Sequence, residues 1–145
     1  MGDVAREALL YLELQITKTQ ARIEIGDLPT VPGDKFQLRQ LFQNLISNAI
    51  KFSKADTVPR IGIESRLPGD GRAEILVKDN GIGFDEKYTD RIFKPFERLH
   101  SRSDYEGSGM GLAICQKIVL RHKGMITAKS APGAGTTFIV TLPVC

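Results

Sequence analysis

Cysteine is scarce in this chain of 145 residues, and tryptophan is absent. The two cysteines, Cys115 and Cys145, cannot build a disulfide framework, and neither has a neighbour at metal-ligand spacing. This usage is typical of cytosolic redox conditions, so we expect a cytoplasmic location. Long hydrophobic runs are missing too, because the longest, such as 75–77 and 118–120, fall far short of the roughly 20 residues that span a bilayer.

A strong excess of one charge is also lacking. Twenty lysines and arginines face 17 aspartates and glutamates, and the net charge of +3 is too small to indicate a nucleic-acid-binding protein. Hydrophobic residues make up 41% of the chain and charged residues 26%, close to the average of globular proteins. We therefore expect one folded domain that is monomeric by itself and binds no nucleic acid.

Hydrophobic periodicity along the chain predicts three helices and five strands. Asp34 is expected to cap the strongest helix, with Gln37 completing a capping box. Helices on one face of a mixed sheet would bury the apolar stripes, which predicts an α+β fold, a two-layer α/β sandwich. The expected helices cover 4–19, 34–53 and 109–121, and the expected strands 22–25, 60–66, 73–78, 125–130 and 136–142, with 60–78 forming a hairpin. The stripe of the strongest helix comprises Leu38, Leu41, Phe42, Leu45, Ile46 and Ala49.

One helix and one strand end carry polar residues suited to a ligand. Asn44, Asn48 and Lys51 lie within about 60° of one another on the helix, where carboxamides can ligate a cation and a lysine suits phosphate. Alone, this set favours an ordinary polar helix face. Asp79 ends a strand before two glycines and could accept a hydrogen bond from an exocyclic amine, although Asn80 and Gly81 also fit a plain hairpin turn.

Two glycine-rich segments follow. The segment 107–111 opens a helix, where exposed N–H groups and the helix dipole favour an anion, and glycines also permit a hinge. The segment 133–137 reads, by itself, as a hairpin turn. Residues 84–108 have no sustained period, and a loop of this length is usually functional or mobile.

Taken in order, these motifs resemble the ATP-binding catalytic domain of sensor histidine kinases, in the superfamily shared with gyrase and the Hsp90 chaperones. The resemblance covers roughly residues 34–143, and the stretches 96–100 and 105–107 are similar to phytochrome-like and hybrid bacterial kinases. It implies the Bergerat fold, a mostly antiparallel sheet covered on one face by about three helices. The segments 44–52, 79–83, 93–96, 107–111 and 133–137 match the N, G1, F, G2 and last glycine boxes.

The resemblance also implies roles for individual residues. Asp79 would bind the adenine amine, supported by Gly83 and Thr137, and Asn48 would ligate Mg²⁺. Residues 84–108 would form the ATP lid, anchored by Phe93 and Phe96, from which Arg98 or Arg102 reaches the γ-phosphate. The other implied ATP-binding residues are Asn44 and Lys51 beside the phosphates, Phe52 flanking the nucleotide, Gly81 and Ile82 in the G1 box, and Gly107, Gly109, Gly111 and Leu112 at the phosphates.

The phosphate acceptor is not apparent in the chain. Neither His100 nor His122 has the flanking residues of a phosphoacceptor, and we expect His122 at a helix end, where a cation suits the dipole. We therefore expect residues 1–33 to be the first helix and strand of the same domain and 34–145 its catalytic core. The acceptor helices would lie upstream of Met1, and a response regulator would act downstream.

Two alternatives stay open. An anti-sigma-factor serine kinase has the same fold, but its N box usually has an acidic first residue, where this chain has Asn44, and a histidine after the Asn-Ala pair. A nucleotide-independent interaction module is the second alternative. Because Asn44 stands where related ATPases place a water-activating glutamate, we expect slow hydrolysis of ATP.

Overall fold

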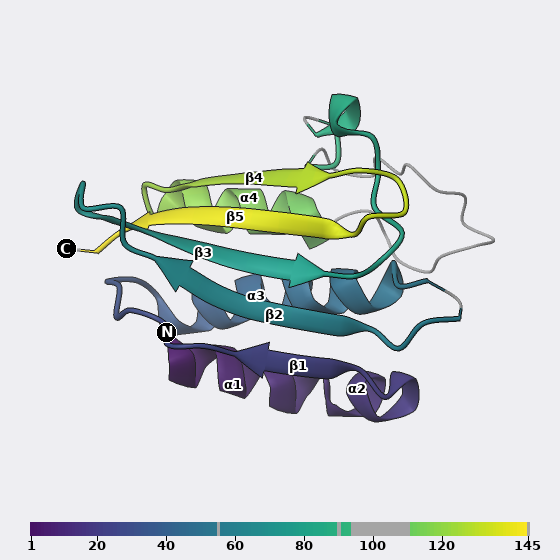
Figure 1. The fold of residues 1–145 in the computed structure, drawn as a ribbon. Coiled ribbons are helices and arrows are strands. Elements are labelled where there is room, and N and C mark those ends of the chain that lie inside the picture. The colour runs from purple at the N-terminus through teal and green to yellow at the C-terminus, as the bar shows by residue number, and fades with distance from the viewer. Residues whose placement is uncertain (55, 90, 94–110, 145) are drawn as a thin grey trace.

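The computed structural model describes residues 1–54, 56–89, 91–93 and 111–144, which form one sheet with helices behind it (Figure 1). The order of the helices and strands is largely the one that the sequence predicts. In chain order they are α1 (Gly2–Tyr11), α2 (Glu13–Thr19), β1 (Arg22–Ile25), α3 (Lys35–Lys51), β2 (Arg60–Arg66), β3 (Arg72–Asp79), the 3₁₀ helix η1 (Glu86–Tyr88), α4 (Gly111–Arg121), β4 (Met125–Ser130) and β5 (Thr136–Pro143).

The sheet has five strands in the order β1-β2-β3-β5-β4. β1 runs parallel to β2, and the other neighbouring pairs are antiparallel. The predicted hairpin of β2 and β3 is confirmed, and β1, β2 and β4 have the bounds that alternation predicts. The sheet is therefore mixed and mostly antiparallel, as expected.

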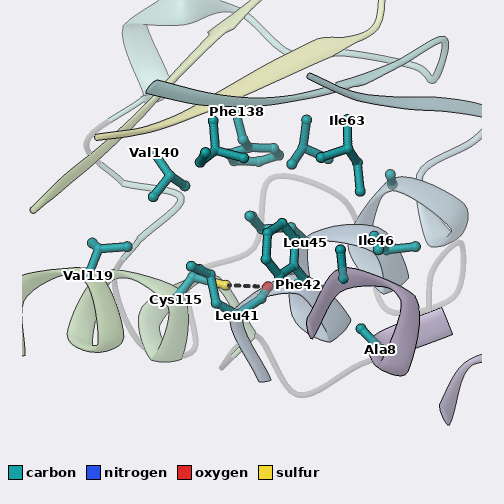
Figure 2. Close-up of a cluster of buried hydrophobic side chains, with 14 of the residues drawn as sticks. Ala8, Leu41, Phe42, Leu45, Ile46, Ile63, Cys115, Val119, Phe138 and Val140 are labelled. Carbon is teal, nitrogen blue, oxygen red and sulfur yellow. Dashed lines mark hydrogen bonds between the residues drawn. The ribbon is translucent and has the colours of Figure 1, made fainter. Parts of the chain in front are cut away.

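The core lies between the sheet and the helices α1, α3 and α4, which pack on the same face (Figure 2). Every residue of the predicted α3 stripe is buried, and Ile50 joins them. In α4, Ile118 and Val119 are buried, while Leu112 and Ile114 are partly buried against the core. The predicted two-layer α+β architecture is confirmed.

The first predicted helix is interrupted. Residues 4–19 form α1 and α2, which are separated at Leu12, where the backbone leaves helical geometry with φ −106° and ψ 9°. Leu12 is buried in the core all the same. The apolar period continues across the break, so periodicity alone does not reveal it.

The start of α3 is capped differently from the prediction. The Asp34 carboxylate accepts hydrogen bonds from the N–H groups of Phe36 and Gln37, at 2.9 and 3.1 Å, as an N-cap residue should. The N–H of Asp34, however, donates to Nε2 of His122, at 3.0 Å. The reciprocal half of the capping box, which we assigned to Gln37, is thus supplied from the end of α4.

His122 lies directly after the carboxyl end of α4, as predicted, and both of its ring nitrogens have hydrogen-bond partners. Because Nε2 accepts a hydrogen bond, the proton is on Nδ1, which lies 2.8 Å from the carbonyl oxygen of Ile118. The ring is closely packed, since a Cβ on Gly33 would lie 2.6 Å from it. His122 joins the amino end of α3 to the carboxyl end of α4.

No helix in the described parts of the chain has the length and hydrophobicity needed to span a membrane.

Phe93, which we expect to anchor the lid, is buried and packs edge-on against Phe138, with ring centroids 6.3 Å apart. Phe96 lies outside the described residues.

Candidate functional site

Four segments distant in the sequence meet at one end of the sandwich (Figure 1). They are the carboxyl ends of α3 and β3, the amino end of α4 and the turn between β4 and β5. The two helices run antiparallel, since His122 joins the start of α3 to the end of α4. Residues of the predicted N, G1 and last glycine boxes are thereby brought together.

Asp79 is the titratable group most affected by this arrangement. Burial raises the pKa of its carboxyl from 3.8 to about 6, and backbone N–H groups of Gly81 and Thr136 partly offset that rise. The N–H of Gly81 donates to Oδ1 at 2.8 Å. A carboxylate this desolvated is suited to accept a hydrogen bond from a ligand.

The segment after Asp79 leaves the sheet and is held against α3. The N–H of Ile82 donates to the carbonyl oxygen of Phe52 at 2.9 Å. A Cβ on Gly81 would lie 2.4 Å from that oxygen, so the position requires glycine. The side chain of Asn80 binds the backbone of Arg60 and Val58. Asn80 and Gly81 therefore do not form the hairpin turn that we kept as an alternative.

The turn between β4 and β5 is a hairpin, as its sequence suggests, and it also packs against the segment after Asp79. Gly135 has a φ of +78°, and a Cβ there would lie 2.1 Å from the Asp79 carbonyl oxygen. Gly83 has a φ of +66°, and a Cβ there would likewise lie 2.1 Å from the carbonyl oxygen of Ala131. The N–H of Gly133 donates to the carbonyl of Ile82 at 2.7 Å. The predicted G1 and last glycine boxes thus form one packed unit.

The register of β3 and β5 decides which threonine adjoins Asp79. Asp79 pairs with Thr136, whereas Lys78 pairs with Thr137. Paired residues share a face of the sheet, so Thr136 lies beside Asp79 and Thr137 lies on the opposite face with Lys78. The structure does not bring Thr137 to Asp79 as we predicted. Alternation offered a signal, because Phe138 is a core residue and Thr136 shares its face.

Ser130, which sequence reasoning missed, connects the parts of this unit. Its Oγ lies 2.9 Å from the N–H of Phe84, 2.8 Å from the carbonyl oxygen of Gly135 and 2.9 Å from Oγ1 of Thr136. Its N–H donates to Glu86, next to the start of the predicted lid. The sequence carries no signal for these contacts, since they depend on where the segment after β3 returns to β4.

On α3, the predicted polar residues lie at the edge of the core. Asn44 and Asn48 are half-buried and Lys51 is exposed. Nδ2 of Asn44 is buried and has no hydrogen-bond partner within the described part of the chain. Its neighbour is the Cys115 thiol of α4: burial raises the pKa of that thiol to about 12, and an interaction with the Asn44 side chain lowers it again. Because only an amide N–H can favour the thiolate, Nδ2 faces Cys115, and the carboxamide is held between α3 and α4.

The phosphate side of the predicted site is described in part. Gly111 is the first residue of α4, and a Cβ there would meet nothing within 4 Å. Leu112 follows it, half-buried against the core. Arg98, Arg102, Gly107 and Gly109 lie outside the described residues.

A metal ion would have few protein ligands here. The described ranges contain no group of three or more His, Cys, Asp or Glu side chains that could hold one. A hard cation would instead depend on carboxamide oxygens, such as that of Asn48, together with oxygens of a bound ligand. This donor set fits Mg²⁺ bound with a phosphorylated ligand.

Comparison with known proteins places the chain in a family. A model of the family described as histidine kinase-, DNA gyrase B- and HSP90-like ATPases matches residues 33–145. The phytochrome-like protein Cph1 of Synechocystis is 46% identical over 98% of the chain, and cyanobacterial phytochrome A of Nostoc is 49% identical over 95%. The chain spans 19% and 18% of these two proteins, about a fifth of their length.

Solved structures of sensor histidine kinases are similar to this chain as well. The mycobacterial sensor histidine kinase MprB is 28% identical and superposes with a TM-score of 0.84 over 99% of this chain and 93% of its own. Full-length ShkA in complex with AMPPNP is 25% identical with a TM-score of 0.80, over 97% of this chain and 29% of its own. The chain belongs to the histidine kinase-, DNA gyrase B- and HSP90-like ATPase family, and within it is an ATP-binding catalytic domain of the histidine kinase type.

Proposed function

We propose that this domain binds Mg-ATP and transfers the γ-phosphate to a histidine on a dimerisation domain absent from the chain. The observation that carries the proposal is the desolvated carboxylate of Asp79, in a segment bonded to the carboxyl end of α3, the helix that carries Asn48 and Lys51. The carboxylate accepts from a base amine, and the Lys51 ammonium suits a phosphate oxygen.

The remaining roles follow from position. Thr136, rather than Thr137, supports Asp79, and Phe52, Gly81, Ile82 and Gly83 form the adenine side. Asn48 supplies the oxygen for Mg²⁺, which when bound neutralises charge on the phosphates. The phosphate side comprises Lys51, the amino end of α4 with Gly111 and Leu112, and the residues predicted from sequence at Arg98, Gly107 and Gly109.

The partners are proposed by analogy. ThkA, 25% identical with a TM-score of 0.78, has been solved with the response regulator TrrA, and this chain covers 40% of that structure's chain. We propose that the phosphate of this kinase likewise passes to a response regulator in the cytoplasm. Residues 1–33 and 34–145 form one domain, with a lid over about 84–108.

Calorimetric titration with Mg-ATP tests the adenine site. We expect saturable, Mg-dependent binding that Asp79→Asn weakens at least tenfold, because the carboxamide is uncharged. Asp70→Asn is a matched control, since the Asp70 carboxylate also accepts from the N–H two residues on, that of Arg72, at 3.1 Å, but in the β2–β3 turn. Equal affinities in all three proteins would refute the proposed site.

Phosphate-transfer assays distinguish a histidine kinase from an anti-sigma-factor serine kinase. Incubation with labelled ATP and a separate dimerisation domain should label that domain on a histidine, and the resulting phosphohistidine is acid-labile. Acid-stable label on a partner's serine would support the anti-sigma-factor kinase instead. Partner binding unaffected by nucleotide, with no transfer, would favour the interaction module.

A further inference from the structure

The hydroxyl of Ser130 has three hydrogen-bond partners, and these fix the direction of each bond. A serine hydroxyl has one proton and accepts through two lone pairs. The carbonyl of Gly135 can only accept, so it takes the Ser130 proton, and the N–H of Phe84 can only donate. Thr136, 2.9 Å away, must therefore donate its own proton to the second lone pair.

The direction of this last bond determines what Thr136 can offer a ligand. Its proton is directed at Ser130, so only lone pairs of Oγ1 remain for other partners. Thr136 is only 9% exposed and pairs directly with Asp79 across β3 and β5. Both side chains on this wall of the site are thereby acceptors.

We propose that Ser130 is a positioning residue that sets the hydrogen-bond polarity of Thr136 and so selects a purine with an amino group at position 6. An exocyclic amine has two N–H donors; Asp79 accepts one and Thr136 the other, directly or through a water. Without Ser130, the Thr136 hydroxyl can rotate and present its proton to the amine, which is repulsive. The inference rests on the proposed function, since it concerns the adenine side of that site.

The test compares two ligands that differ only at position 6. ATP carries an amine there and purine riboside triphosphate a hydrogen, so the ratio of their dissociation constants measures the contribution of the amine. Titration calorimetry with Mg²⁺ should show tighter binding of ATP to the wild type. Ser130→Ala should reduce this ratio about three- to tenfold, the range expected for one hydrogen bond.

A double-mutant cycle separates this role from a structural one. Thr136→Val removes the acceptor but leaves Ser130 its contacts with Phe84 and Gly135, so it should lower the ratio alone; adding Ser130→Ala should lower it no further. Ser130→Thr keeps a hydroxyl and should retain the wild-type ratio. Ser65→Ala is the matched control, because Ser65, on β2, donates through Oγ to the carbonyl oxygen of Asp27 at 2.8 Å.

The outcomes are distinguishable. If Ser130→Ala weakens both ligands equally, or lowers the ratio as much in the Thr136→Val background, Ser130 is structural and the inference fails while the proposed function stands. If the wild type binds neither ligand, the proposed function fails, and the inference with it. Should Ser130→Ala not fold, Ser130→Cys, whose thiol is a weak donor and acceptor, takes its place in the same double-mutant cycle.

Discussion

Asp79 shows how a single buried carboxyl can oppose folding. Its pKa of about 6 in the folded chain exceeds the ordinary 3.8, so between pH 4 and 6 the folded state binds more protons than the unfolded state. The free energy of unfolding therefore falls as pH rises through this window. Above it, the charged carboxylate costs roughly 3 kcal/mol, at 1.36 kcal/mol per pKa unit.

Asp79→Asn should accordingly stabilise the ligand-free protein at pH 8 and leave its stability near pH 4 unchanged. The carboxamide oxygen can still accept from Gly81, and no charge is buried. We expect the melting temperature at pH 8 to rise by several degrees, measured by circular dichroism at both pH values. An equal change at the two pH values would show that ionisation of Asp79 is not the cause.

At the scale of elements, the turn between β4 and β5 holds two glycines with the same backbone and different surroundings. Gly133 and Gly135 have φ values of +79° and +78°. A Cβ on Gly133 would meet nothing within 4 Å, whereas one on Gly135 would lie 2.1 Å from the Asp79 carbonyl oxygen. The contributions of backbone strain and of steric overlap to the free energy of unfolding can thus be measured separately at these two positions.

Gly133→Ala should cost about 1 kcal/mol, the strain of a left-handed alanine. Gly135→Ala should cost at least 3 kcal/mol, because the end of β3 must shift as well. Urea denaturation of both variants gives the two free energies of unfolding. Equal costs would mean that the turn moves away from β3 freely.

Elements were predictable where a local pattern determines them, and contacts between elements were not. Alternation was sufficient for β1, β2 and β4, and periodicity for the buried stripe of α3. The pairing of Asp79 with Thr136 depends on the register of strands 57 residues apart, and the bond from Asp34 to His122 on a separation of 88 residues. Alternation from Phe138 puts Thr136 on the core face, but nothing local in the sequence indicates that this face carries Asp79 or that His122 reaches Asp34, so we predicted Thr137 beside Asp79 and Gln37 in the capping box.

At the scale of the whole molecule, His122 joins two helices at the end away from the site. It accepts from the N–H of Asp34 and donates to the carbonyl of Ile118. His122→Ala removes the hydrogen bond to the exposed N–H of Asp34 and the packing against Gly33, so we expect a loss of about 0.5–1.5 kcal/mol in the free energy of unfolding. Arg121→Ala, at the exposed neighbouring position, should change it by less than about 0.5 kcal/mol.

The junction at His122 fixes the carboxyl end of α4 against the start of α3. α4 has 11 residues and so extends about 16 Å from it towards Gly111, at 1.5 Å per residue. By simple geometry, tilting the helix by about 5° at this point carries its first turn roughly 1.4 Å, half the length of a hydrogen bond. At the proposed phosphate site, a tilt of this size would be enough to make or break a hydrogen bond to a phosphate oxygen.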